Sequence, residues 1–226
     1  MRLMHRDFGF AFEFEENVRN ILVIESPAIF RRLVSELYCN NEDSNFVLSE
    51  NFTPLKLSDN INCIVDYFNF SLNERKILNK LQDYLKAEIS SSDLLLEQGT
   101  IFSLIEQYAF NLQQISDWQL DFDYKPEISV LLKFMNVRFK EEGSTLLERL
   151  VDYVTAANEF CAVKLFVLVD LFLYFTEDEI EKLYDHFNYK KLNLLLVESK
   201  VPPDIKRFAN AVVIDRDCCE INLGML

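Results

Sequence analysis

The hydrophobic pattern changes twice along the chain, from strand spacing to helix spacing and back again. Near the start, phenylalanine occupies every second position of Phe8–Phe14, which places four rings on one side of a strand. The run Asn20–Glu25 is apolar in its interior without alternation, as expected of a strand covered on both faces. Ser26-Pro27 then begins a helix that continues to about Cys39. The first part of the chain therefore predicts alternating strands and helices.

Helical spacing replaces this pattern in the middle of the chain. Apolar residues recur at helical intervals through Leu72–Ile89 and Leu94–Ile115, with a short break between the two segments. Two long helices joined in this way predict an antiparallel helical hairpin. Further helices are predicted from Pro126 to about Met135 and over Ser144–Phe160, with Ser144 as the cap of the second. We therefore expect an all-helical leg inserted over residues 72–159.

Strand spacing resumes in the last third of the chain. Lys164–Asp170 and Asn193–Glu198 have the composition of buried strands, and Ala211–Asp215 completes the series. Between them, Thr176 is expected to cap a helix that ends near His186. Strand, helix and strand at this length form a parallel crossover unit, which is right-handed almost without exception. The predicted fold class is α/β, with a mostly parallel head formed by residues 1–71 and 160–226.

The composition limits the classes of function. Half of the 226 residues are hydrophobic, which excludes a wholly disordered chain. The formal net charge of −14 argues against wrapping of nucleic acid by the whole surface, so any DNA site must be confined to one face. Five cysteines without framework spacing indicate reduced thiols in a cytoplasm. Because the apolar runs are too short to span a bilayer and no signal peptide is recognisable, we expect a cytoplasmic protein without a membrane partner.

The residue types available for catalysis are few. The strand Lys164–Asp170 has the shape of the acidic strand that holds magnesium in phosphate-loop ATPases. The phosphate loop itself needs two glycines and a Lys-Ser or Lys-Thr pair, whereas the four glycines here lie far apart and precede no such pair. Only His5 and His186 are available as bases, and neither lies in a motif that supports a nucleophile. We therefore predict that the protein is not an enzyme.

One acidic segment is a candidate metal site. Asp121, Asp123 and Glu127 alternate out of an extended stretch onto the first turn of a helix, and hard oxygen ligands of this kind suit calcium. The stretch is not an EF-hand loop, because Pro126 occupies its glycine position and Leu132 the place of its bidentate glutamate. By spacing alone, a solvated acidic turn with Asp121 and Asp123 on its wet side is favoured over a calcium site. Both interpretations stay open at this level.

Basic residues occur in scattered pairs and not in one patch. On helices such pairs usually lie on solvated faces, and one chain would then repel a polyanion. Repeated by symmetry around a ring of subunits, however, two or three pairs per chain supply phosphate contacts without a net positive charge. The pairs are Arg31-Arg32, Arg75-Lys76, Lys190-Lys191 and Lys206-Arg207.

No single motif of this chain is diagnostic, but the order and spacing of several strings are specific. The strings are Asn20-Ile21-Leu22-Val23-Ile24-Glu25-Ser26-Pro27 with Phe30–Tyr38, Leu57–Leu81, Leu120-Asp121-Phe122-Asp123-Tyr124 continuing to Val137, and Lys164–Glu198. In this order they resemble the family of CRISPR-associated spacer-acquisition proteins of type II-A systems, from about residue 17 to 215.

The resemblance implies a fold, an assembly and a role. Members of this family have an α/β head related to phosphate-loop ATPases, with the nucleotide site lost and a helical leg inserted. Four subunits form a ring around a hole wide enough for duplex DNA, and structural calcium ions steady the arrangement. Members bind the ends of double-stranded DNA without sequence preference and have no known nuclease activity. They act with the integrase and the effector nuclease during CRISPR adaptation.

The resemblance also implies metal ligands. Asp121, Asp123 and Glu127 fall in the calcium-binding segment of the family, with Asp117 and Gln119 as further candidates. With the resemblance added, calcium is favoured over a solvated turn at this segment. The chain departs from the family at Lys125-Pro126, which interrupts a stretch that is more acidic in relatives. Fewer bound ions or weaker binding would follow.

For DNA binding, the first helix of the head carries a basic position in this family. Arg31 and Arg32 match it, and Lys190, Lys191 and Lys200 are further candidates for phosphate contacts. The sequence thus predicts a noncatalytic, calcium-stabilised tetrameric ring that binds double-stranded DNA during spacer acquisition. Two alternatives stay open: a metal-dependent nuclease that uses the acidic segment with magnesium, and a scaffold whose leg docks a partner helix.

Overall fold

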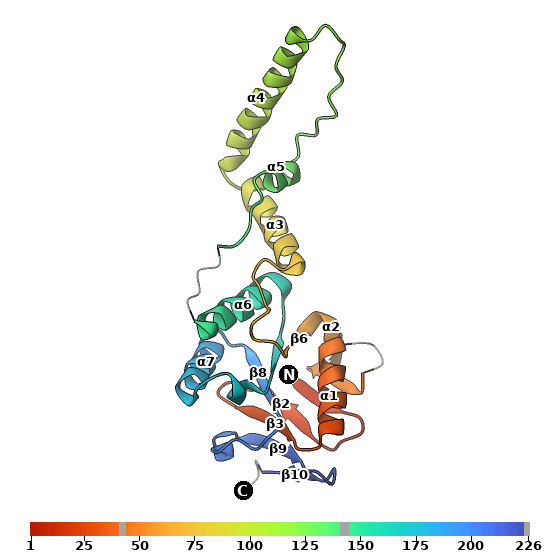
Figure 1. The fold of residues 1–226 in the computed structure, drawn as a ribbon, viewed down its shortest axis with the longest axis vertical. Helices are drawn as coiled ribbons and strands as arrows, with labels where there is room; N and C mark the ends of the chain where they lie inside the picture. The colour runs from red at the N-terminus through yellow and green to blue at the C-terminus, as the bar shows by residue number, and fades with distance from the viewer. Residues whose placement is uncertain (41–43, 141–144, 224–226) are drawn as a thin grey trace. The chain divides into compact units, whose positions relative to one another are not determined.

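The computed structural model describes residues 1–40, 44–140 and 145–223, and the chain forms two compact units (Figure 1). The α/β unit comprises Met1–Ser71 and Glu141–Leu226, and the helical unit is Leu72–Lys140. Helix α6 (Leu146–Cys161) belongs to the α/β unit, where Tyr153 accepts a hydrogen bond from Asn62 and packs against another aromatic ring. The predicted C-terminal end of the leg at residue 159 is therefore corrected to Lys140, because α6 buries its apolar side in the α/β unit.

A six-stranded sheet forms the centre of the α/β unit. Its strands in spatial order are β10 (Glu220–Asn222), β9 (Asn210–Ile214), β3 (Asn20–Ile24), β8 (Asn193–Glu198), β7 (Leu165–Val169) and β6 (Ile61–Ile64). All neighbours are parallel except β10, which pairs antiparallel with β9. The α/β class with a mostly parallel sheet is therefore confirmed.

The buried apolar runs of the sequence became the central strands. All five residues of β3 and all five of β7 are buried, as are five of the six residues of β8. Continuous burial of this kind requires cover on both faces of the sheet. The strands predicted over Asn20–Glu25, Lys164–Asp170, Asn193–Glu198 and Ala211–Asp215 are confirmed, with ends that differ by at most one residue.

A second, antiparallel sheet packs against the first. Its strands in spatial order are β2 (Ala11–Glu13), β1 (Arg2–His5), β4 (Phe46–Glu50) and β5 (Thr53–Leu55). The predicted strand over Phe8–Phe14 is a strand only at β2, but Phe10, Phe12 and Phe14 are buried as the alternation requires. These rings share one hydrophobic cluster with residues of β3, β7 and β8. The row of phenylalanines therefore joins the two sheets.

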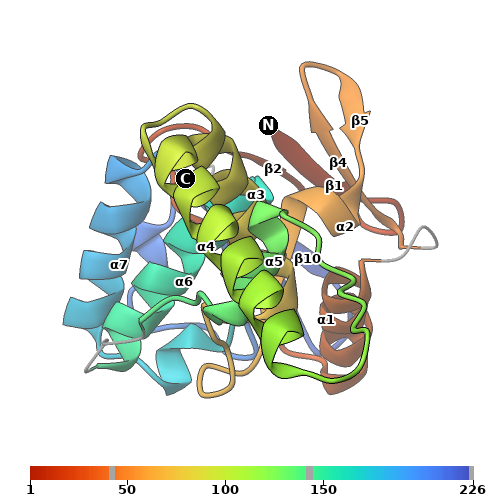
Figure 2. The ribbon, with the colours of Figure 1, turned by 90° about the horizontal axis from the view of Figure 1, so that it is seen from above.

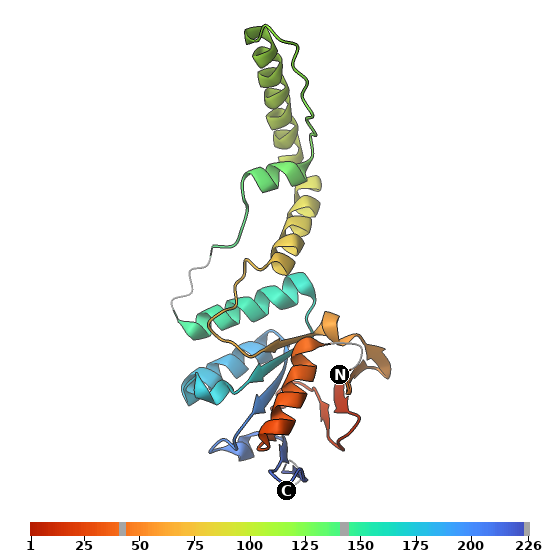
Figure 3. The same cartoon turned by 45° about the vertical axis from the view of Figure 1, so that its right-hand side comes forward.

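Helices cover both faces of the six-stranded sheet. Helix α1 (Pro27–Cys39) lies on one face, and α6 and α7 (Glu177–Tyr189) lie on the other (Figures 2 and 3). The strand order explains this arrangement: the chain crosses the sheet from β3 to β6 and returns through β7 to β8. Crossovers of one hand must then place their helices on opposite faces for the two directions. The cap that was predicted at Ser144 lies outside the described residues, and Thr145 forms a capping box with Glu148. Short helical turns complete this unit: α2 (Leu57–Asn60), η1 (Leu171–Leu173) and η2 (Ile205–Arg207).

The helical unit contains α3 (Arg75–Ser90), α4 (Leu94–Ile115) and α5 (Ile128–Phe134). The antiparallel hairpin predicted for α3 and α4 is wrong, because α4 continues onward from the end of α3 (Figures 1 and 3). Hydrogen bonds of helical type persist through the break, from Ser92 to Ile89 and from Leu95 to Ser92. Asp93 also keeps right-handed helical dihedral angles, so the chain does not reverse. Among the described helices, none is long and apolar enough to cross a membrane.

Candidate nucleic-acid interface

The acidic segment lies in an extended stretch between α4 and α5. Its side chains are exposed at all five predicted ligand positions, Asp117, Gln119, Asp121, Asp123 and Glu127. The stretch is anchored to the end of α4 by the Gln113 amide, which donates to the Trp118 carbonyl at 2.9 Å and accepts from the Leu120 amide at 2.8 Å. The segment is therefore ordered at its start and solvated along its length.

These carboxylates do not gather into a metal centre in one chain. Asp121 and Asp123 are two residues apart in an extended chain, which separates their Cα atoms by about 7 Å. Glu127 lies four residues further on, and its Oε2 accepts a hydrogen bond from Ser129 at 3.2 Å. Within the described ranges, no three His, Cys, Asp or Glu side chains are arranged to hold an ion. The residues present thus do not enclose calcium in this arrangement, and the calcium site stays a prediction.

Three of the five predicted DNA-binding residues are engaged in ion pairs. Arg32 pairs with Asp7 at 3.4 Å, Lys190 with Glu159 at 3.2 Å, and Lys191 with Glu16 at 2.8 Å. The hydrogen bond from Lys191 lowers the pKa of Glu16 below its ordinary value. Each of these cations would have to exchange a carboxylate for a phosphate before it could hold DNA. That exchange reduces the favourable free energy that each of these cations contributes to DNA binding.

The structure also separates the predicted residues in space. Helix α1, with Arg31 near its start, follows β3, and Lys200 follows β8, so both lie toward the edge where the parallel strands end. Lys190 and Lys191 precede β8 and therefore lie at the opposite edge of the sheet. The five residues do not form one patch on a single chain. Arg31 and Lys200 are both exposed and have no ion pair among the described residues.

A denser group of basic residues lies in the helical unit. Two segments, residues 72–82 and 128–140, together hold six basic residues and one acidic residue, a formal charge of +5 in a chain of −14. Five of these cations are exposed and form no ion pair with a carboxylate of the described residues. We call these five the helical-unit cations: Arg75, Lys76, Lys80, Lys133 and Arg138.

Backbone and side-chain contacts bring the two segments together. The Asn73 amide donates to the Phe139 carbonyl at 3.1 Å and accepts from the Phe139 amide at 2.9 Å. Helices α3 and α5 are also in contact, and their buried residues are Ile77, Leu81 and Leu132. Residues more than fifty positions apart thus share one region. The sequence displayed Arg75-Lys76 as a pair, but no local signal links that pair to Arg138.

The edge where the parallel strands end holds carboxylates in place of a phosphate loop. Only Glu25 and Ser26 join β3 to α1, and the Glu25 amide donates to the Ile214 carbonyl at 2.9 Å. Pro27 has no amide hydrogen. A phosphate loop needs a row of free amides at this point, because those amides hold the phosphate oxygens. This connection does not supply that row.

Two carboxylates cross-link the loops that follow β7 and β8. Glu198 is 3% exposed, and its Oε1 accepts a hydrogen bond from the Leu171 amide at 2.8 Å. Asp170, which has a left-handed backbone with φ of 51°, accepts from the Ser199 amide at 2.7 Å. Burial, assisted by the negative charge of Asp170, raises the pKa of Glu198 to about 8. Glu198 is thus largely protonated at neutral pH. The backbone amides of Leu171 and Ser199 at this edge are hydrogen-bonded to side chains of the same chain.

The substitution Glu198→Gln is expected to change how stability depends on pH. In the unfolded chain the carboxyl ionises near pH 4.5, while in the folded chain it keeps its proton to about pH 8. The folded state therefore binds more protons in this window, and Glu198 costs about 1.4 kcal/mol of stability per pH unit as the pH rises. In urea unfolding from pH 5 to 9, the free energy of unfolding of the variant should rise relative to that of the wild type up to about pH 8. A pH-independent difference would contradict the buried, protonated carboxyl.

Comparison with known proteins identifies relatives over most of the chain. A family model described as CRISPR-associated protein (Cas_Csn2) matches residues 38–218. A CRISPR-associated protein Csn2 of Streptococcus agalactiae is 22% identical over 213 residues, covering 91% of each chain. A CRISPR-associated protein Csn2 of Enterococcus faecalis is 17% identical over 186 residues, which cover 80% of this chain and 82% of that protein.

Solved structures with some similarity in fold are ATP-binding cassettes. An ATP-binding cassette of an ABC transporter in its ADP conformation has a TM-score of 0.44 and 13% identity, over 95% of this chain and 84% of that chain. A dimeric ATP-binding cassette in a post-hydrolysis state, bound to ADP and phosphate, has a TM-score of 0.41 and 9% identity, over 94% and 88%. The strand order of the six-stranded sheet, and not these similarities, defines the fold class.

Proposed function

This chain belongs to the Cas_Csn2 family of CRISPR-associated proteins, and from that premise we propose that it binds double-stranded DNA during CRISPR adaptation. In this proposal it acts in the cytoplasm, without catalysis and without sequence preference, as a homotetrameric ring that cooperates with the integrase and the effector nuclease. The observation that carries the proposal is the group of helical-unit cations, which have no carboxylate partner among the described residues.

Lysine and arginine side chains without a carboxylate partner can form ion pairs with the phosphates of a DNA duplex. Phosphates repeat identically at every base pair, so contacts to them give affinity without sequence preference. A chain with a net charge of −14 repels DNA over most of its surface, so the contacts must come from a limited region. In a symmetric assembly the five helical-unit cations are repeated in each copy. The proposal therefore places the phosphate contacts on the helical unit, in addition to Arg31 and Lys200.

The surface of α4 supports self-association. Only Glu97 and Glu106 are charged in this helix of 22 residues. Large apolar side chains are exposed at intervals of seven along it, which places them in one stripe on the helix surface; we call this stripe the seam. Exposed apolar surface of this extent usually marks an interface. The seam residues, with their exposed fractions, are Leu94 (50%), Ile101 (38%), Tyr108 (65%) and Ile115 (79%).

Phosphate binding predicts a strong dependence on salt. The logarithm of the affinity for linear duplexes is expected to fall with the logarithm of salt concentration by about 0.9 per phosphate contact, whatever the base sequence. Fluorescence anisotropy with two unrelated duplexes measures both properties. Threading through a ring further requires closed circles to bind more weakly than linear DNA, and equal affinity would contradict it.

Two experiments separate the alternatives. DNA incubated with the protein and magnesium or manganese is expected to stay intact, and cleavage would favour the nuclease that uses the acidic segment. Absence of DNA retention in calcium buffer at low salt would instead favour the protein-interaction scaffold.

Calcium enters the proposal as a structural ion. The resemblance implies it at Asp121, Asp123 and Glu127, although one chain does not enclose an ion there. In calcium buffer the mass in solution is expected to be near four times that of the monomer, and chelation is expected to lower it. Light scattering after chromatography measures both states, with magnesium as the control ion. A tetramer that is indifferent to chelation would remove calcium from the proposal, and a monomer in every buffer would remove the ring.

A further inference from the structure

The edge strand β2 has backbone groups that no other strand uses. Leu3 is the register partner of Phe12, and the Phe14 amide donates to the Met1 carbonyl at 2.8 Å. Hydrogen-bonded positions alternate in an antiparallel pair, so the backbone groups of Ala11 and Glu13 face away from β1. Within the part of the chain that the structure describes, β2 pairs with β1 alone. Among the described residues, two amides and two carbonyls on its outer edge therefore have no hydrogen-bond partner.

The next outward-facing position shows what these groups can bind. Gly9 continues the series of Ala11 and Glu13, two residues earlier in the chain. Its amide donates to Oε2 of Glu220 at 2.8 Å, so a side chain of β10 occupies the first donor of this edge. A hydrogen-bond acceptor thus already approaches the outer edge from the far side.

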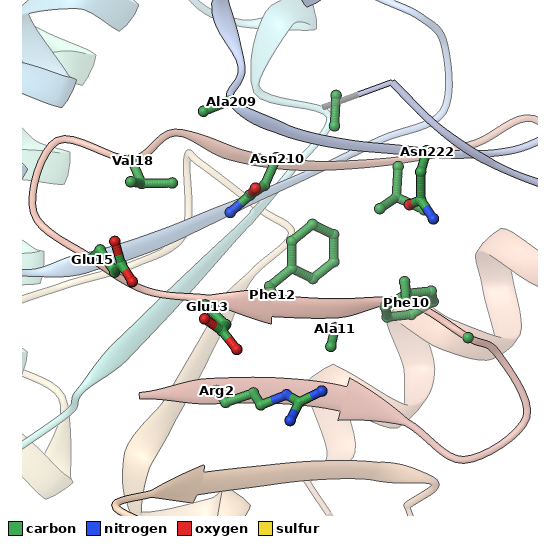
Figure 4. A pocket seen from close by; sticks show the side chains of 13 residues that line it. Arg2, Phe10, Ala11, Phe12, Glu13, Glu15, Val18, Ala209, Asn210 and Asn222 are labelled. Carbon is green, nitrogen blue, oxygen red and sulfur yellow. The ribbon is translucent and has the colours of Figure 1, made fainter. Parts of the chain in front are cut away.

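The free edge of β2 faces a groove of about 480 Å³. In Figure 4, β2 lies between β1, which carries Arg2, and an opposite wall to which Asn210 and Asn222 belong. The accessible apolar part of the lining comes from Ala11, Val18 and Ala209, because Phe10 and Phe12 are only 2% and 0% exposed. The groove thus offers free backbone groups and apolar side chains together, which are the two elements of strand recognition.

The opposite edge of the same sheet lacks this capacity. It is formed by β5, which carries Pro54, a residue without an amide hydrogen. Proline on an edge strand is one of the devices by which proteins prevent further strand pairing. The edge at β2 contains neither proline nor lysine. Of these two edges, only β2 is chemically able to accept another strand.

We propose that this groove binds an extended segment of a partner protein, in which apolar and basic residues alternate, as an added strand beside β2. The charged residues that line it are Arg2, Glu13 and Glu15, one cation against two anions, a formal charge of −1. A basic segment complements this lining and the net charge of −14 of the whole chain. Alternation lets every second side chain pack on the apolar lining while the others reach the glutamates.

A single extended segment fits the groove better than a second copy of this chain. A strand that belongs to a folded sheet brings a neighbour about 4.8 Å away on its other side. The wall that contains Asn210 and Asn222 would collide with such a neighbour. A single extended segment brings no second strand with it, so it can lie between β2 and the wall that contains Asn210 and Asn222. This inference does not depend on the proposed DNA binding, since none of the helical-unit cations lines the groove.

The probe for this site is a blocked hexapeptide of alternating lysine and valine with a fluorescent label. It is expected to bind the full chain, and Ala11→Pro is expected to weaken it about tenfold, the effect of one lost backbone hydrogen bond in a dry groove. The Ala11 amide makes no bond within the sheet, so β1 and β2 stay paired in this variant. Glu15→Lys, which changes an exposed residue, should weaken the lysine peptide and leave thermal unfolding unchanged.

Two N-methylated peptides provide the matched control. One carries methyl groups on the lysine amides and the other on the valine amides, so each can donate from only one edge. One of them is expected to keep its affinity and the other to lose about tenfold, because only one edge faces β2. Equal affinities of the two would overturn the proposal, as would equal binding of an alternating glutamate and valine peptide. A change in the mass of the protein alone on Ala11→Pro would overturn it in favour of a second copy.

Discussion

Neutralising three helical-unit cations is expected to lower the affinity for duplex DNA by at least tenfold. The variant Arg75→Gln, Lys76→Gln, Arg138→Gln removes cations that have no carboxylate partner among the described residues, so each lost phosphate contact is a net loss. The slope of affinity against salt should become shallower by about 0.9 for each contact removed. Fluorescence anisotropy at several salt concentrations measures both changes.

The matched control is Arg32→Gln, Lys190→Gln, Lys191→Gln. It changes the net charge by the same amount, from −14 to −17, at residues that are already paired with carboxylates. Its expected effect on DNA affinity is less than about threefold. Each of these cations must give up its carboxylate partner in order to bind a phosphate, so its net contribution to the free energy of DNA binding is small. If this control weakened binding as much as the first variant, the contacts would lie on the α/β unit. Equal and negligible effects of both variants would contradict DNA binding by either group.

Placing charge in the α4 seam is expected to dissociate the assembly. In Ile101→Glu, Tyr108→Glu two apolar side chains that are 38% and 65% exposed are replaced by carboxylates. Burying either carboxylate against a second helix without a cation would cost several kcal/mol, which exceeds the contribution of most interface residues. The mass in solution should therefore fall from that of the oligomer to that of a smaller species. Light scattering over a range of protein concentrations measures the change.

The control for the seam is Ser103→Glu, Gln107→Glu, which adds the same two charges to exposed polar positions of α4. These positions lie beside the seven-residue repeat and not in it, so the oligomer should persist. Circular dichroism should show the same helix content in both variants, because glutamate is a good helix former. An oligomer that survives the first variant would show that α4 is not the interface. An oligomer lost in both variants would point to the general charge of the helix.

The strands of the central sheet were predictable because burial on both faces leaves a local signature. Four apolar runs of five or six residues became β3, β7, β8 and β9. The cap of α7 was equally local, since Thr176 and Glu179 bond to each other across one turn. Such features depend on neighbours in sequence, which a single chain displays directly.

The same local rules failed where a junction decided the outcome. Nothing in the spacing of α3 and α4 distinguishes a reversal from a continuation, and the helical dihedrals of Asp93 fix the latter. The end of the helical insertion was misplaced because the amphipathic pattern of α6 states that one face is buried, but not against which unit. Amphipathic periodicity shows that a helix buries one face, but it does not identify the element against which that face packs.

The candidate site divides in the same way. The sequence determined which residues are acidic, basic or apolar, that a phosphate loop is missing, and that the strands of a parallel sheet are present. The tertiary structure decided which charges are free. It paired Lys190 and Lys191 with Glu159 and Glu16, and it left Arg75 and Arg138 in one region without an ion pair to any described carboxylate. The physical reason is that a charge becomes available to a ligand only when no opposite charge lies within about 4 Å, and that distance is set by the packing of segments far apart in the chain.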